Sequence, residues 1–308
     1  MMFRFEREGT HWIDLENPTA DEVREAAHEL GFGGRIIEEL ISPSPLPLVL
    51  HEEPAALLVL HFPSLVTGAR SASQTPQKEV DFVVGKHFVL TVRYEVVAPL
   101  HELRRLLETN TLLGKNARTP ADALLELLFN HLYGNIRIEV SQAGRRLERI
   151  EQELFAGKES TTVRAISEIS REFLHLEATI AGEEDALTLF LDDLSDKEIF
   201  GPSFTPRSKR ILAQHAQTAH FVATLRAVAA ELRETNAALL NTKQNEIMQR
   251  LTVVTFMLLP LSLIVNMFEM NLPGVPFSTH PQAFWVIVGI MCIVAGVLIF
   301  FFTRKRWL

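Results

Sequence analysis

The sequence predicts an α/β domain that continues into long helices and ends in a two-helix membrane hairpin. Three observations support this fold class. Short apolar runs alternate with turn signals as far as Pro99, and long amphipathic helical patterns follow it. From Leu251 onward the chain is almost uncharged.

The composition excludes several other classes of protein. At 47% hydrophobic and 22% charged residues, the chain of 308 residues is too apolar to be disordered. The single cysteine, Cys292, rules out a disulfide framework or a thiolate cluster within one chain. The net charge of −8 argues against nucleic acid as a partner.

The first elements are a short strand and a capped helix. The run His11–Leu15 predicts a strand, and the following Asn-Pro-Thr predicts its exit turn. Thr19 followed three residues later by Glu22 forms a capping-box pattern, and Gly31 is placed to end the helix.

Three further strands are predicted before the helical region. Ala56–Phe62 reads as a buried strand, and Ser64–Lys78 as a polar loop. Val80–Val84 and Phe88–Tyr94 flank Gly85-Lys86-His87, which is typical of a β-hairpin turn.

Long amphipathic helices are predicted over Pro120–Phe155 and Val163–Leu194, separated by a polar stretch. Pro206 then opens a helix that meets no Gly or Pro until Pro260. Along it the spacing of three and four is typical of a coiled-coil seam, formed by Val222, Leu225, Ala229, Leu232, Asn236 and Leu239. A helix of about 65 residues, about 97 Å long, would not bury this stripe alone, which favours a homo-oligomer.

Two apolar stretches predict membrane spans. Leu251–Met270 carries one charge in 20 residues and Ala283–Thr303 carries none in 21, enough to cross about 30 Å of hydrocarbon. A hairpin buried in a soluble core is the alternative. Arg304-Lys305-Arg306 should stay cytoplasmic, which places both termini inside a multi-pass protein of the cell (inner) membrane. Residues 1–20 lack the apolar core of a signal peptide.

The predicted organisation therefore has seven parts. They are an α/β cytoplasmic domain (1–119), a helical hairpin (120–205), a stalk helix (206–250), a pore-lining first span (251–270), an outer loop (271–282), a second span (283–303) and a basic tail (304–308).

A polar stripe runs along the first span. At helical spacing the face reads Asn245, Met248, Leu251 or Thr252, Thr255, Leu259, Ser262, Asn266 and Glu269. Polar groups inside a membrane must face protein or water. The stripe therefore lines a pore shared by several copies, or it joins helices by hydrogen bonds.

Several motifs resemble those of CorA-type divalent cation transporters. The run Asn245-Glu-Ile-Met248-Gln-Arg-Leu251-Thr252, with Pro260 and Met270-Asn271 after it, resembles the first span of that family. The tail Arg304-Lys-Arg-Trp-Leu308 and the opening Trp12-Ile-Asp-Leu-Glu-Asn-Pro-Thr19 match as well. The resemblance implies a funnel-shaped homopentamer with a central pore for magnesium, cobalt or nickel, or for zinc in the ZntB-like branch.

The resemblance also implies roles for individual residues. Asn271 occupies the filter position that would hold a hydrated cation through its water shell. Met248 and Leu251 fall on the hydrophobic gate, Asn245 lies at its cytoplasmic mouth, and Ser262 fills a polar position in the middle of the pore.

Two residues depart from the family pattern. The usual Gly-Met-Asn is Glu269-Met270-Asn271 here, and another usual glycine is Asn266. A ring of Glu269 carboxylates would attract a divalent ion at about 7 Å by about 1 kcal/mol each, even in water. This ring would alter ion selectivity and could coordinate the ion directly. Alternatively, Glu269 points into the outer loop region.

Other candidate ion contacts each have a plainer interpretation. The loop Asn271–Gln282 lacks an acid, and its composition looks closer to that of the zinc-type branch. His280 in this loop either contacts an ion or is merely exposed to solvent. The resemblance also implies a cation sensor made of carboxylates between subunits, one of them on the stalk. Ser203–Ala230 contains no Asp or Glu, which puts a sensor of this kind in doubt here. His215 and His220 there are metal ligands or structural histidines. The acidic clusters are Glu183-Glu184-Asp185 and Asp192-Asp193 with Asp196, and they gather cations or are solvated helix faces.

The sequence thus predicts a divalent metal cation channel or transporter whose partners are the bilayer, its cargo cations and further copies of itself. The expected metal is cargo, and no cofactor is expected. The alternatives are proton-coupled zinc transport and a non-transporting membrane scaffold or sensor. An enzyme is not expected, because no phosphate-binding loop or catalytic constellation is present in the sequence.

Overall fold

The computed structural model describes residues 2–7, 9–63, 77–108, 120–269 and 283–305. It divides into two compact units, Met1–Arg233 and Glu234–Leu308, and helix α6 (Phe204–Glu269) contributes to both.

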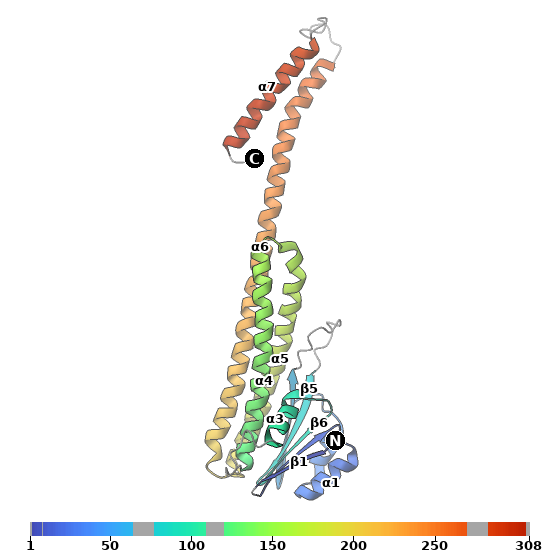
Figure 1. Cartoon of the computed structure of the whole chain (residues 1–308), viewed down its shortest axis with the longest axis vertical. Helices are drawn as coiled ribbons and strands as arrows, with labels where there is room; N and C mark the ends of the chain where they lie inside the picture. Colours follow the sequence, from blue (N-terminus) through green and yellow to red (C-terminus); the bar gives the residue numbers. More distant parts are fainter. Residues whose placement is uncertain (1, 8, 64–76, 109–119, 270–282, 306–308) are drawn as a thin grey trace. The chain divides into compact units, whose positions relative to one another are not determined.

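The first unit is built on a six-stranded sheet (Figure 1). In spatial order its strands are β1 (Met2–Arg7), β2 (Thr10–Glu16), β6 (Phe88–Arg93), β5 (Gln77–Gly85), β4 (Ala55–Pro63) and β3 (Leu48–Glu52). All neighbouring strands are antiparallel except β2 and β6, which pair in parallel with His11 opposite Phe88.

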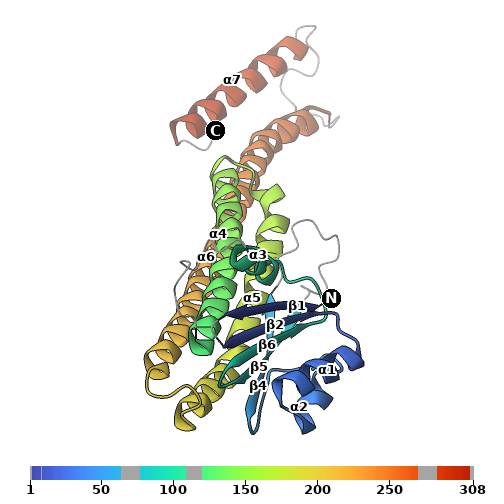
Figure 2. The same cartoon turned by 60° about the horizontal axis from the view of Figure 1, so that its bottom comes forward.

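Helices cover both faces of the sheet (Figure 2). On one face α1 (Ala20–Leu30) and α2 (Gly34–Glu39) bury residues such as Val23 and Ile36 against Ile13, Leu57 and Leu90. On the other face lie α3 (Ala98–Glu108), α4 (Ala121–Phe155) and α5 (Glu159–Asp196). An α/β domain of three layers results.

Helix α1 begins and ends at the predicted residues. The Thr19 hydroxyl accepts from the backbone N–H of Glu22 at 3.3 Å, and the Glu22 carboxylate accepts from the backbone N–H of Thr19 at 2.8 Å. Gly31 follows the helix with φ of 78°, in the left-handed region that favours glycine. The capping box and the glycine stop are confirmed.

The predicted hairpin of β5 and β6 is also present. Gly85 pairs with Phe88 across a two-residue turn. The predicted loop Ser64–Lys78 is wrong at its end, because Gln77 and Lys78 pair with β4 as part of β5. The rest of that loop, residues 64–76, lies outside the described residues.

Four elements of the first unit were not predicted, namely β1, β3, α2 and α3. The long helices were predicted more closely. Helix α5 begins at Glu159 rather than Val163, and α6 begins at Phe204, two residues before Pro206. Pro206 fits there because the first turn of a helix needs no backbone donor.

The coiled-coil seam on α6 is largely buried within one chain. Val222 and Ala229 are fully buried, Leu232 is 5% exposed, and the side chain of Leu225 lies over Gly144 of α4. The inference that this stripe needs further copies of the chain is therefore wrong for these residues. They are covered by the same chain, and Leu225 by helix α4.

Candidate functional site

The second unit holds two helices that are long and apolar enough to cross a membrane, α6 and α7 (Ala283–Arg304). In the most apolar stretch of each, only 6% of the residues are buried. Apolar helices left this exposed need lipid or further protein around them. Together with their composition, this identifies a membrane hairpin rather than a soluble core.

The predicted pore face of α6 is exposed along its whole described length. Met248, Leu251 and Leu259 are 54%, 58% and 59% exposed. The other described members of the face are exposed too, namely Asn245, Thr255, Ser262, Asn266 and Glu269. Met270 and Asn271, the remainder of the predicted filter, lie outside the described residues.

The covered face of α6 lies on the opposite side. Val253 is 1% exposed, and Met257, Pro260, Leu261 and Ile264 are half-buried. At about 100° per residue, the centre of this face is about 180° from the centre of the polar stripe. The hairpin therefore shields its apolar side and leaves the polar stripe without cover from its own chain.

Most polar groups of the stripe have no partner in the described part of the chain. The hydroxyls of Thr252 and Thr255 donate to the backbone carbonyls of Met248 and Leu251 at 2.8 and 2.9 Å. These hydroxyls can therefore only accept a further hydrogen bond. Among the described residues, no hydrogen bond or ion pair is formed by Ser262, Asn266 or Glu269. In lipid each such group would cost several kcal/mol. Water or further protein must therefore face the stripe.

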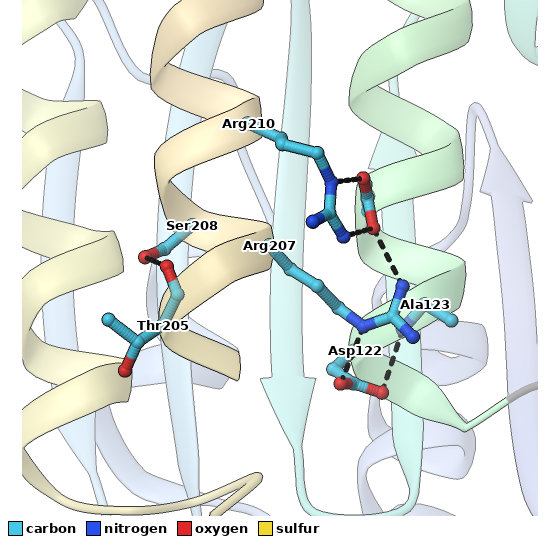
Figure 3. Close-up of polar contacts among 7 residues, drawn as sticks. Asp122, Ala123, Thr205, Arg207, Ser208 and Arg210 are labelled. Atoms are coloured by element: carbon cyan, nitrogen blue, oxygen red, sulfur yellow. Dashed lines mark hydrogen bonds and ion pairs between the residues drawn. The ribbon is translucent and has the colours of Figure 1, made fainter. Parts of the chain in front are cut away.

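The start of α6 is fixed to α4 by paired charges (Figure 3). Arg207 contacts Asp122 at 2.9 Å and Glu126 at 2.7 Å, while Arg210 contacts Glu126 through Nε at 2.5 Å. These hydrogen bonds, that from Arg210 first, lower the pKa of Glu126 below its ordinary value. Arg207 and Arg210, which lie in the stretch Ser203–Ala230 that lacks acids, are thus neutralised within the subunit.

The two stalk histidines differ in environment. His215 is buried, its Nε2 lies 2.9 Å from the carbonyl oxygen of Ile180, and its ring meets Tyr133 edge-on at 5.5 Å. Such contacts belong to a packed structural histidine. His220 is exposed. Within the described ranges, no group of three or more His, Cys, Asp or Glu could hold a metal ion.

The acidic clusters of α5 are only partly solvated. Glu184 and Asp185 are exposed, but Glu183 is fully buried, and burial raises its pKa well above the ordinary value. A solvated face was therefore the wrong interpretation for Glu183. Asp193 contacts His51 at 2.7 Å and Lys197 at 2.8 Å, so it is also committed within the chain.

One titratable cluster was missed altogether. Glu79 and Asp81, on β5, lie buried beside Glu39, His61 and Tyr94. Its signal was available, because two acids at alternate positions of an otherwise apolar strand point to the same face. The predicted strand Val80–Val84 left Glu79 outside, so the pair was not recognised.

The chain matches the family described as CorA-like Mg2+ transporter protein over residues 7–306. It is 21% identical over 305 residues to the cobalt/magnesium transport protein CorA of Methanocaldococcus jannaschii, covering 96% of this chain and 91% of that one. It is 22% identical to the Thermotoga maritima protein of the same name, covering 96% and 83%.

Solved structures share the fold. The complete CorA magnesium transporter of M. jannaschii superimposes with a TM-score of 0.80 at 19% identity, covering 99% of this chain and 94% of that chain. The ZntB cytoplasmic domain of Vibrio parahaemolyticus gives 0.56 at 12% identity, covering 77% and 90%. The similarity to the complete transporter therefore includes the membrane hairpin, whereas the ZntB structure is of a cytoplasmic domain alone.

Proposed function

Since this chain belongs to the CorA-like Mg2+ transporter family, a family of membrane transporters and not of enzymes, we propose that it moves divalent cations of the Mg2+, Co2+ or Ni2+ type across the cell membrane. Passage would follow the polar face of α6. Its relatives from M. jannaschii and T. maritima carry cobalt and magnesium in their names, which supports this choice of ions.

The observation that carries the proposal is the uncovered polar stripe of α6. The stripe lies opposite the covered face of the hairpin and is exposed at every described position. Two helices cannot enclose a path, so several copies would have to turn this face toward a common axis. A homopentamer is the assembly that the family resemblance implies, and both termini would face the cytoplasm.

The residues of the stripe would act in sequence along the pore. Asn245 would lie at the cytoplasmic mouth, Met248 and Leu251 would form a gate that closes by excluding water, and Ser262 would contact the ion's water shell. A divalent cation as small as Mg2+ loses its water reluctantly, so amide and hydroxyl groups suit it.

The outer end would select the ion. Asn271 would hold the hydrated cation, with Met270 beside it, and Glu269 would add a ring of negative charge. About 1 kcal/mol per carboxylate corresponds to about a fivefold rise in local cation concentration for each. Asn266, one helical turn before Glu269, would add a ring of amide groups. Amide groups coordinate a hydrated cation only weakly and would contact its water shell.

Flux into liposomes tests the proposal. Purified protein should carry Mg2+, Co2+ or Ni2+ down a gradient, and Asn271→Ala should abolish selective flux. Glu269→Gln should reduce flux most at low cation concentration, because it removes only the charge. Val254→Ala, an exposed position off the stripe, is the matched control and should behave as wild type. Absence of divalent flux from folded wild-type protein would overturn the proposal and leave the scaffold interpretation.

Proton-coupled zinc transport is a second candidate. The outer loop carries no acid, and 77% of the chain shares the fold of the ZntB cytoplasmic domain. This partial likeness supports zinc transport more weakly than the full-length likeness supports the first candidate. An inward proton gradient should then accelerate zinc flux. Zinc flux that is indifferent to the gradient excludes this candidate.

A further inference from the structure

A buried group of acids lies between the sheet and the chain that connects α2 to β3. Glu79 and Asp81 stand two residues apart on β5 and so share one face, the face covered by α1 and α2. Asp81 is fully buried, and the side chain of Glu79 is 8% exposed. Glu39, from the end of α2, faces the same pair.

The hydrogen-bond donors in this cluster are too few for its carboxylate oxygens. The Tyr94 hydroxyl has one hydrogen and two acceptors, Asp81 Oδ2 at 3.3 Å and the Leu40 carbonyl at 3.1 Å. The backbone N–H of Ser44 donates to Glu79 Oε1 at 2.8 Å. Asp81 Oδ1 is buried and receives no hydrogen bond from any described group.

No lysine or arginine of the described chain neutralises the cluster. The titratable groups that face Glu79 and Asp81 are Glu39 from α2, His61 from β4 and Tyr94 after β6. His61 Nε2 lies 2.8 Å from the carbonyl oxygen of Ser44, which can only accept, and 3.7 Å from Glu79 Oε2. Two adjacent carboxylates without a cation repel each other strongly in such a site.

A hydrogen atom between the two carboxyl groups would supply the missing donor. We propose that Glu79 and Asp81 together bind one proton at neutral pH, and that its release at higher pH loosens the Leu40–Pro47 connection. A proton on the pair gives one carboxyl an O–H that donates to the other, which satisfies the orphaned oxygen. It also removes one of two buried charges.

The connection is anchored directly on this cluster. Ser44 donates its N–H to Glu79 and its hydroxyl to Glu39 at 3.3 Å, and it accepts from His61. Deprotonation would leave Glu79 and Glu39 charged at Ser44 with the charged Asp81 beside Glu79, and their repulsion would push Glu79 and Glu39 away from Ser44.

The direction of the pH dependence follows from the shift. Burial is the largest cause that raises the pKa of both Asp81 and Glu79 above their ordinary values. The stability that the shared proton contributes is therefore fully present below the ordinary carboxyl pKa. It is lost as the pH rises through the raised pKa of the pair.

Infrared spectroscopy of the full-length protein tests proton binding directly. A protonated-carboxyl band should be present at neutral pH and should weaken in Asp81→Asn and in Glu79→Gln. Glu183→Gln is the control, because Glu183 is a second buried carboxyl with a raised pKa, on α5. If the band is lost only in Glu183→Gln, or is unchanged in Asp81→Asn, the proposal is wrong.

Hydrogen exchange tests the conformational consequence. Protection of peptides covering residues 40–52 should fall, by up to about tenfold per pH unit, as the pH rises from the ordinary carboxyl pKa to the raised pKa of the pair, and should level off above it, after correction for intrinsic exchange. Asp81→Asn should flatten this profile, because its amide can donate to Glu79 and still accept from Tyr94. Glu79→Gln offers a second variant if the first fails to fold. Identical profiles in wild type and a folded variant would overturn the proposal.

Discussion

Arg93 lies fully buried in β6 and holds two carboxylates of the neighbouring strand. It contacts Asp14 at 2.9 Å and Glu16 at 2.8 Å. Asp14 also accepts from the Thr91 hydroxyl at 2.8 Å, which in turn accepts from the indole N–H of Trp12 at 3.1 Å. Each buried polar group of this network thus depends on the others.

Removal of one carboxylate from this network should be costly. Asp14→Ala leaves a buried guanidinium with a single acid and removes the acceptor of the Thr91 hydroxyl hydrogen, so we expect a loss of about 3 kcal/mol in unfolding free energy. Chemical denaturation followed by tryptophan fluorescence measures it, with Trp285 and Trp307 replaced by Phe in both proteins. Asp21→Ala, which breaks the exposed pair with Arg24, should cost less than about 1 kcal/mol. Equal losses in the two variants would contradict this account.

At the residue scale, the roles of residues in local motifs were predicted correctly from the sequence, and contacts between residues distant in sequence were not predicted. Thr19, Glu22 and Gly31 were found because a capping box and a glycine stop lie within one helix. The Trp12–Glu16 segment was recognised as a motif, but its partner Arg93 was not, because register across a sheet joins residues far apart in sequence. Burial of Glu183 on α5 was missed because the residues that cover it, such as His61, are also far away in sequence.

At the element scale, α4 and α6 pack closely at one glycine and are clamped at one end. A side-chain Cβ at Gly144 would lie 3.3 Å from a methyl group of Leu225, so the two helices approach each other at this point. Near the start of both helices, Glu126 receives hydrogen bonds from Arg207 and Arg210. Packing and charge therefore fix α6 within its own subunit.

A bulky residue at the close approach should separate the helices. Gly144→Leu places a branched side chain against Leu225 and should lower unfolding free energy by about 2 kcal/mol through overpacking. The same change at Gly182, a helical glycine of α5 with no atom within 4 Å of a new Cβ, should be neutral or stabilising. Thermal unfolding of both variants provides the comparison, and a stable Gly144→Leu would disprove tight packing there.

The charged clamp should weaken in acid. Because the pKa of Glu126 is lowered, its stabilising contribution is present above the ordinary glutamate pKa and is lost as the pH falls through the lowered value. Glu126→Gln should lower the unfolding free energy by about 2 kcal/mol at neutral pH. It should also remove part of the decrease in unfolding free energy that the wild type shows as the pH falls. Denaturation across the acidic range measures this. If the unfolding free energy of the variant falls in acid as much as that of the wild type, the clamp contributes little.

Elements with strong internal patterns were predicted, and weakly patterned ones were not. β4 is buried throughout and α4 spans 35 residues, so each carries its own signal. β3 is only half-buried, and α2 is six residues long without a side-chain cap at Gly33. Such elements form because Ile36 and the neighbouring strand hold them in place, and this support is invisible to local propensity.

At the scale of the whole molecule, charge and hydrophobicity are divided between two regions. Up to Arg250 the chain carries 27 basic and 37 acidic residues, whereas from Leu251 onward Glu269 is the single acid in the sequence. The spans were predictable because each is a long, nearly uncharged apolar run, and the polar stripe was predictable because it is periodic within one helix. The arrangement of copies was not, since contacts between subunits leave no such period in one chain.

Copies of the chain should meet at the polar stripe. In a Cys292→Ser background, Ser262→Cys should form disulfide-linked dimers on mild oxidation in membranes if, as proposed, the stripe faces a shared axis. Val254→Cys, off the stripe on the same helix, should crosslink much less. Gel electrophoresis without reductant reads the result. Equal crosslinking at the two positions would argue against a central stripe.

The parallel pairing of β2 with β6 governs how the domain assembles in time. His11 meets Phe88 across 77 residues, and closing a loop of that length costs about 4 kcal/mol of chain entropy, whereas β5 and β6 meet across two residues. The β4–β5–β6 meander is thus expected to fold first. The β1–β2 hairpin can dock only after β6 has been synthesised. Until then the edge of β2 that will pair with β6 stays exposed and can pair with wrong partners.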